Sequence, residues 1–190
     1  MNNTPRLLQV RVYGDDILRV KSLPVKQFDD DLRTLVQDML YTMYERDGVG
    51  LAANQVGYTL RVFVIDMDWS KEDGKPTPVA LINPVILEGA GEYEMEEGCI
   101  SVPSIFARIK RFNKIRYSYL DTDGKEHIEE AEGYKAVVIQ HENDHLNGVL
   151  FVDKLGKLAH LKIKRKLKLI ESTTVNGVNI RTDIYWETSQ

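Results

Sequence analysis

Residues 134–148 read YKAVVIQHENDHLNG, and this segment predicts both a central helix and the chemistry that the helix carries. At its centre His141-Glu142-Asn143-Asp144-His145 forms an H-E-x-x-H motif. Two histidines four positions apart on a helix share one face, with Cβ atoms ~6 Å apart, so both imidazoles can bind one small cation. Glu142 can flank that cation without ligating it and move protons for a coordinated water. The motif therefore predicts a metal site with hydrolase chemistry.

The residues around the motif predict the helix that it needs. The apolar run at 136–139 leads into the histidines and indicates a helix that passes through the core. Asn147-Gly148 follows Leu146 and is a plausible left-handed stop signal. The alternative is two unrelated helix histidines with a surface glutamate between them, and the motif alone does not decide between the two.

Composition narrows the class of protein. The chain has 190 residues, 43% hydrophobic and 28% charged, as expected of one globular domain that can bury a core without a structural metal. A formal charge of -4 argues against nonspecific nucleic-acid binding as the main role. We find no secretory signal and no run near the ~20 apolar residues of a membrane span. The single cysteine permits no intrachain disulfide, so we expect a cytoplasmic protein without a membrane partner.

Hydrophobic periodicity predicts the remaining elements. A capped helix is expected over 29–45 and a surface loop over 66–78. Strands are expected over 60–65, 79–82, 85–87, 114–120 and 125–132, and a basic amphipathic helix over 155–170. Without regular strand–helix alternation, this pattern predicts an α+β fold with antiparallel sheets around the central motif helix. We expect a single catalytic domain over 1–170 and a C-terminal tail over 171–190 that forms either an extra strand or a loose end.

The third metal ligand is left open by the motif. Catalytic sites of this kind commonly use three protein ligands and a water, and the usual downstream histidine is missing because Phe151 stands at that position. His160 is one substitute. Cys99 is the other, in what we expect to be a short glycine-containing loop, because a thiolate beside a divalent cation is deprotonated and binds tightly.

Three segments resemble, in order and spacing, the three signatures of peptide deformylases. They are GVGLAANQ at 48–55, EGCIS at 97–101 and HENDH at 141–145, within a likeness that covers roughly residues 12–153. The sequence departs from many members at Asn54, where they carry proline. The resemblance implies the deformylase fold and removal of the formyl group from the initiator formyl-methionine of nascent polypeptides, with release of formate.

The resemblance also implies a ligand set and a metal. Cys99, His141 and His145 would hold one divalent metal per chain, Fe²⁺ in the cell, with Zn²⁺, Ni²⁺ or Co²⁺ able to replace it in purified samples. Residue types alone do not choose among these metals. By the same resemblance the Gln55 side-chain amide and the Ile100 backbone N–H stabilise the oxyanion that forms when the formyl carbon is attacked.

Further roles follow for the residues around this centre. Glu142 would act as the proton shuttle, and Glu97 and Arg111 would form an ion pair that holds the Cys99 segment. Gly50 belongs to a segment that can pair with an extended substrate in strand-like fashion. Candidates for the apolar methionine pocket are Val49, Tyr134 and Val137.

The sequence also leaves two alternative functions and one further partner to consider. A general zinc endopeptidase does not account for the segments with Cys99 and Gln55, and a noncatalytic binding module leaves Glu142 unexplained. The substrate of a deformylase emerges from the ribosome, so the basic face of 155–170 is a candidate for salt-sensitive contacts with ribosomal RNA. The alternative for that helix is an ordinary solvated surface.

Overall fold

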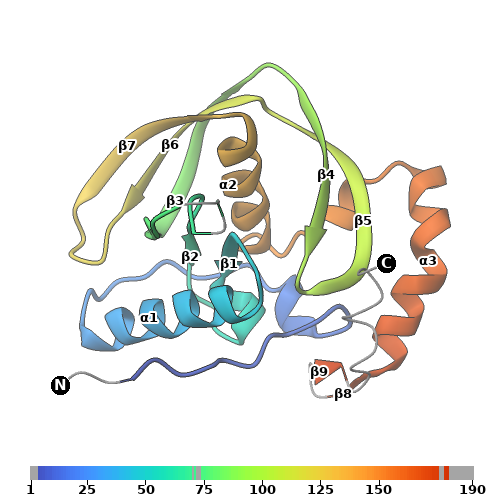
Figure 1. Ribbon diagram of the computed structural model, residues 1–190, viewed down its shortest axis with the longest axis horizontal. Coiled ribbons are helices and arrows are strands. Elements are labelled where there is room, and N and C mark those ends of the chain that lie inside the picture. The colour runs from blue at the N-terminus through green and yellow to red at the C-terminus, as the bar shows by residue number, and fades with distance from the viewer. Residues whose placement is uncertain (1–3, 70, 72–73, 176–177, 180–190) are drawn as a thin grey trace.

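The computed structural model describes residues 4–69, 71, 74–175 and 178–179 (Figure 1). Among the helices of this described part, none is long and apolar enough to cross a membrane. In chain order the elements are η1 (Asp16–Arg19), α1 (Asp30–Glu45), β1 (Gly50–Ala52), η2 (Ala53–Val56), β2 (Val62–Ile65), β3 (Val79–Ala90), β4 (Tyr93–Cys99), β5 (Val102–Arg111), β6 (Lys114–Leu120), β7 (Glu126–Glu132), α2 (Gly133–His145), η3 (Phe151–Lys154), α3 (Lys157–Ser172), β8 (Thr174–Val175) and β9 (Val178–Asn179).

An antiparallel sheet separates the two principal helices. Its strand order is β1-β2-β3-β6-β7, which leaves β1 at one edge. Because side chains alternate along a strand, Val62 and Val64 of β2 pack with α1, whereas Phe63 and Ile65 pack with α2 on the opposite face. The predicted α+β fold, with antiparallel strands around the motif helix, is confirmed.

Both predicted core helices form close to their expected bounds. Asp29 caps α1 by accepting a hydrogen bond from the Leu32 backbone N–H at 3.0 Å. Helix α2 ends at His145, and Gly148 follows with a φ of 73°, in the left-handed region that the stop signal requires. The motif therefore lies on a helix buried against the sheet.

The strands β4 and β5 lie where the sequence analysis predicted none. They form a two-stranded ribbon that arches over α2 toward α3 (Figure 1). The alternation of apolar and polar residues is hard to recognise in these strands. Their outward face carries charged residues that pair with opposite charges across the ribbon, Glu94 with Lys110 and Glu96 with Arg108. Cys99 is accordingly the last residue of β4, and the expectation that it lies in a loop was wrong.

Strand β3 also differs from the prediction, since one strand replaces the two expected on either side of Asn83-Pro84. Asn83 has a φ of 51°, and the register with β6 shifts between Ile82 and Val85. The Asn83 side chain bonds both the N–H and the C=O of Val25, at 2.8 and 2.9 Å. These bonds support a bulge, which accommodates the proline without ending the strand.

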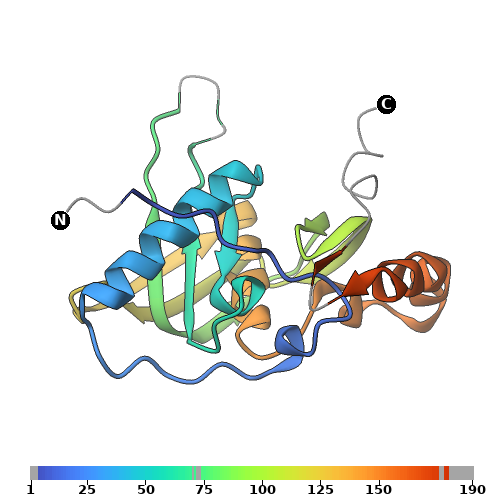
Figure 2. The same ribbon diagram turned by 90° about the horizontal axis from the view of Figure 1, so that it is seen from below.

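Helix α3 lies at the end of the molecule farthest from α1 (Figure 2). It begins at Lys157 and ends at Ser172, two residues later at each end than predicted. Leu167 and Ile170 are buried, whereas Leu158 is 79% exposed. The tail forms the short hairpin β8–β9, and the predicted tail from 180 to 190 lies outside the described residues.

Candidate metal centre and active site

The side chains of Cys99, His141 and His145 converge. Their ligand atoms all lie within 4.8 Å of one another, and this is the only such group of potential metal ligands in the described part of the chain. The Cys99 Sγ lies 3.3 Å from the His145 Nε2. His160 points elsewhere, with its Nδ1 3.4 Å from the Val152 carbonyl oxygen. Of the two candidate third ligands, the structure brings Cys99 to the histidine pair.

Secondary structure accounts for this convergence. The spacing of four residues places both imidazoles on one face of α2, with ring centroids 5.0 Å apart. The last residue of β4 carries the thiol to them. Phe151, which replaces the downstream histidine of related motifs, stacks on His141 at 5.9 Å. An apolar ring thus packs against one of the two imidazoles at the position where related motifs carry a further histidine.

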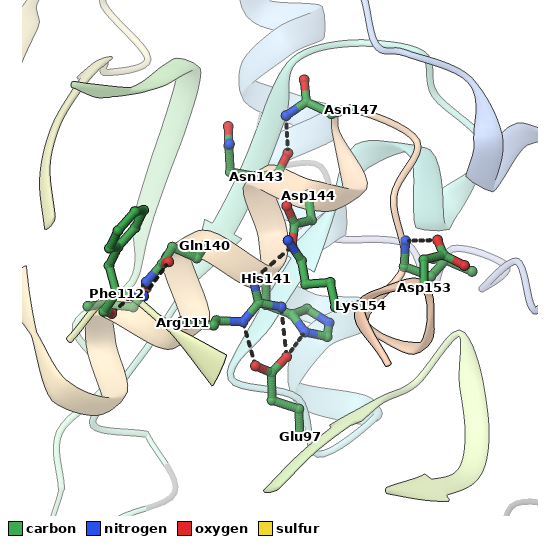
Figure 3. A network of polar contacts seen from close by, with 12 residues as sticks. Glu97, Arg111, Phe112, Gln140, His141, Asn143, Asp144, Asn147, Asp153 and Lys154 are labelled. Carbon is green, nitrogen blue, oxygen red and sulfur yellow. Dashed lines mark hydrogen bonds and ion pairs between the residues drawn. The ribbon is translucent and has the colours of Figure 1, made fainter. Parts of the chain in front are cut away.

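A chain of charged side chains orients His141 from behind (Figure 3). Its Nδ1–H donates to the Glu97 carboxylate at 2.8 Å. Arg111 donates to both carboxylate oxygens of Glu97, and its third nitrogen donates to Asp144 at 2.7 Å. Lys154 reaches the same Asp144 oxygen at 3.1 Å. The Nε2 of His141 is thereby directed toward Cys99 and His145, the arrangement by which outer carboxylates orient metal-binding imidazoles.

Burial and pairing set the charges of these groups. Burial alone would raise the pKa of Glu97, but hydrogen bonds from Arg111 and His141 lower it to about 2. Burial and then the neighbouring charge of His141 hold the pKa of His145 well below its usual range, so its imidazole is neutral. A neutral imidazole, a second imidazole oriented by a carboxylate, and a thiol fit a divalent metal.

Glu142 lies beside the ligand cluster on the same helix. Its side chain is buried, and its Oε2 has no hydrogen-bond partner among the described residues. Burial raises the pKa of this carboxyl to about 7. Gly50 of β1 makes room for it, because a Cβ there would lie 2.6 Å from the Glu142 Oε1. The site therefore holds a carboxyl suited to proton transfer near neutral pH.

The Gln55 amide has a fixed orientation. Its Oε1 accepts the Ala52 backbone N–H at 2.8 Å. Its Nε2 consequently points the other way and donates to the Ser101 hydroxyl at 3.1 Å and toward the Cys99 Sγ at 3.4 Å. Ile100 lies between these two residues in the turn that joins β4 and β5. The structure thus brings the Gln55 and Ile100 segments to the thiolate.

Two of the three proposed pocket residues, Tyr134 and Val137, lie on helix α2. Tyr134, Val137 and His141 are spaced by three and four residues, so they share one face of α2. Tyr134 is 46% exposed and Val137 is buried. Burial, and then the charges of Glu142 and Glu97, raise the pKa of Tyr134. Val49 is half-buried against the core between the sheet and α2.

Sequence reasoning missed three residues that support the site. Asp144 and Lys154 extend the chain behind His141, although Asp144 lies inside the motif and its charge complements Arg111. Asn54 is buried, and its Nδ2 donates to the His145 carbonyl oxygen at 2.5 Å. A polar residue where many deformylases carry proline was the available signal for this last contact.

A Cys-His-His donor set with an adjacent buried glutamate defines the class as a mononuclear metallohydrolase. The comparisons give the family: the chain belongs to the polypeptide deformylases, whose family model matches residues 7–160. A peptide deformylase of Alkalilimnicola ehrlichii is 47% identical over 171 residues, 90% of this chain and 94% of that protein. Members of this family are metal-dependent and remove the N-formyl group from nascent polypeptides, which decides against the endopeptidase and the binding module.

Solved structures agree with the fold. The peptide deformylase of Thermotoga maritima is 47% identical, with a TM-score of 0.74, over 80% of this chain and 99% of that one. A class I type b deformylase of Acinetobacter baumannii, solved with Met-Ala-Ser bound, is 34% identical with a TM-score of 0.75, over 80% of this chain and 100% of that one.

Proposed function

We propose that Cys99, His141 and His145 hold one divalent metal, Fe²⁺ in the cell, at which formyl-methionyl peptides are deformylated. The observation that carries this proposal is the convergence of the three ligand atoms within 4.8 Å beside the buried Glu142. The chemistry supplied by such a metal is Lewis acidity, which polarises a carbonyl and lowers the pKa of a coordinated water from ~15.7 toward ~7. Zn²⁺, Ni²⁺ or Co²⁺ would fit the same donors.

Glu142 is the proton carrier in this proposal. Its unpartnered oxygen can accept a proton from water as the formyl carbon is attacked, and the same oxygen can then donate that proton to the departing amine. Burial holds its pKa at about 7 in the protein alone, and a nearby cation would lower this pKa, so that the carboxylate form is ready to act as a base.

The Gln55 amide and the Ile100 backbone N–H stabilise the oxyanion that forms on the formyl group. Gln55 is preorganised because Ala52 holds its oxygen, which directs its N–H donors toward the Cys99 side of the site. Each donor of this kind contributes ~10²-fold in rate or more. Ser101 supports the same orientation by accepting from the amide nitrogen.

The open edge of β1 binds the substrate backbone. Val49 and Asp66 form a hydrogen-bonded pair, with the Asp66 N–H donating to the Val49 carbonyl at 3.0 Å. Hydrogen-bonded and non-bonded pairs alternate along an antiparallel ladder, so Gly50, opposite Ile65, directs its N–H and C=O away from β2. An extended peptide can pair there next to Glu142. Met-Ala-Ser, bound by the Acinetobacter baumannii deformylase, is a peptide of this kind.

The methionine side chain enters an apolar pocket formed by Val49, Tyr134 and Val137. Helix α2 carries two of these residues on the face of His141, so the pocket adjoins the metal ligands. The catalytic unit spans residues 1–170, in the compartment where ribosomes translate, which we take to be the cytoplasm. The exposed lysines of α3 contact ribosomal RNA near the emerging chain.

The test is formate release from formyl-Met-Ala by protein of measured metal content. The proposal predicts one metal per chain and stoichiometric formate and Met-Ala. A metal-loaded protein that leaves the formyl-peptide intact would refute it. Anaerobically prepared iron protein should also lose activity in air faster than a nickel-substituted form, because an iron-thiolate is open to oxidation at Cys99; equal decay would refute the choice of iron.

A further inference from the structure

The loop that follows β2 begins with a corner organised by one carboxylate. Asp66 is fully buried. Its Oδ1 accepts the backbone N–H groups of Asp68 and Trp69 at 2.9 and 3.1 Å, and its Oδ2 accepts the Tyr44 hydroxyl and the Thr77 N–H at 2.8 and 3.0 Å. Four donors on one buried carboxylate fix the two ends of the loop to each other and to the last turn of α1.

This corner places Trp69 at the start of the substrate-pairing edge. The indole Nε1–H donates to the Gly48 carbonyl at 2.9 Å. The ring packs edge-to-face on Tyr44, with centroids 5.3 Å apart and planes at 62°. Trp69 is only half-buried, so part of the ring faces solvent. Its single hydrogen-bond donor is already used, which leaves the ring surface for contact with a ligand.

The direction of a bound peptide follows from the two ends of β1. Gln55 and Cys99 lie at the end that follows Ala52, so the formyl group must lie there. The rest of the peptide then runs back along the edge past Gly50. Residues of a strand advance ~3.3 Å each. With methionine opposite Gly50, the third residue reaches Gly48, where the indole sits.

We propose that Trp69 is a specificity-determining residue that contacts the side chain of the third residue of the substrate, an inference that rests on the proposed function. Because the indole offers its ring and no free donor, it favours apolar, aromatic or cationic side chains over acidic ones at that position.

Peptides of two lengths separate this role from a structural one. For Trp69→Ala we expect KM for formyl-Met-Ala-Phe to rise about fivefold, the size of one lost aromatic contact. Its kcat should stay unchanged, and both constants for formyl-Met-Ala should match wild type. The control is Trp186→Phe, at the other tryptophan of the chain. It should leave KM and kcat for both peptides unchanged. Equal losses on both peptides, or none on either, would overturn the inference.

A binding measurement avoids any substitution at position 69. The chain has 2 tryptophans, so metal-loaded Trp186→Phe protein emits only from Trp69. Saturating Met-Ala-Phe should shift or quench this emission, while saturating Met-Ala should not. The same change with both products, or no change with Met-Ala-Phe at a concentration that fully inhibits turnover, would overturn the contact. Wild-type protein that binds Met-Ala-Phe but releases no formate from formyl-Met-Ala-Phe would instead refute the proposed function.

Discussion

Two charged regions of this molecule differ in how their charges are used. Behind the ligand cluster, Glu97 and Arg111 are each 6% exposed and bonded to specific partners (Figure 3). On α3, Lys157, Lys164 and Lys168 are exposed, and none forms an ion pair with another residue in the described part of the chain. A buried charge needs a matched partner and so fixes geometry, whereas exposed charges act mainly through the field they share. The buried pair orients the imidazole of His141, whereas the exposed lysines of α3 can only attract negatively charged partners.

The largest expected effect lies in the buried region at Glu142. Glu142→Gln keeps the shape of the side chain and removes its basicity, so turnover of formyl-Met-Ala should fall ~10²- to 10⁴-fold. The metal content should stay at the wild-type level, because the carboxyl is not a ligand. Activity near wild type, or loss of the metal, would show that the role of Glu142 is misassigned.

The ion pair behind His141 should come next. Arg111→Met leaves Glu97 buried without its cation, and breaking a buried pair in this way costs about 3–5 kcal/mol of stability. Metal affinity should fall ~10- to 100-fold, because the orienting carboxylate is no longer held. Thermal unfolding and a competitive chelator titration measure the two effects.

Arg33→Met is the matched control for that variant. Arg33 pairs with Asp30 and Asp123 at the surface. Its loss should leave the melting temperature and the metal affinity essentially unchanged. Equal effects of the two substitutions would remove the distinction between the buried and the exposed charges.

A smaller effect is expected on the alkylation rate of the Cys99 thiol, and this effect depends on the bound metal. As a ligand, its sulfur should react with an alkylating reagent at least about tenfold more slowly in metal-loaded protein than after chelation. The chain has one cysteine, so a single labelling rate reports on this residue. Identical rates in the two states would make it a bystander.

The smallest effect on chemistry belongs to α3. Changing Lys157, Lys164 and Lys168 to glutamate should weaken co-sedimentation with ribosomes at low salt and leave hydrolysis of formyl-Met-Ala intact. The control reverses three other exposed lysines, Lys21, Lys26 and Lys125, and changes the net charge equally. Equal loss in both triple variants would indicate net charge alone, and no loss in either would return α3 to a structural role.

Prediction from the sequence succeeded where the spacing of residues along the chain reports directly on a helix face or a ligand pair. The repeat of His141 and His145 predicts both a helix face and a ligand pair, and the apolar periodicity of 29–45 predicts α1 within one residue. It failed for β4 and β5, since their outward residues are charges matched across strands that no local pattern reveals. Asn54 and Asp144 were missed because their partners lie far away in sequence or are defined only by the fold.

The ligand set can be tested most directly by X-ray absorption on zinc-substituted protein. If Cys99, His141 and His145 hold the metal, the spectrum should show one sulfur at about 2.3 Å and two imidazole nitrogens at about 2.0–2.1 Å. Cys99→Ser should remove the sulfur and leave the imidazoles. A site without sulfur, or with a third imidazole such as that of His160, would contradict the ligand set on which the proposed chemistry depends.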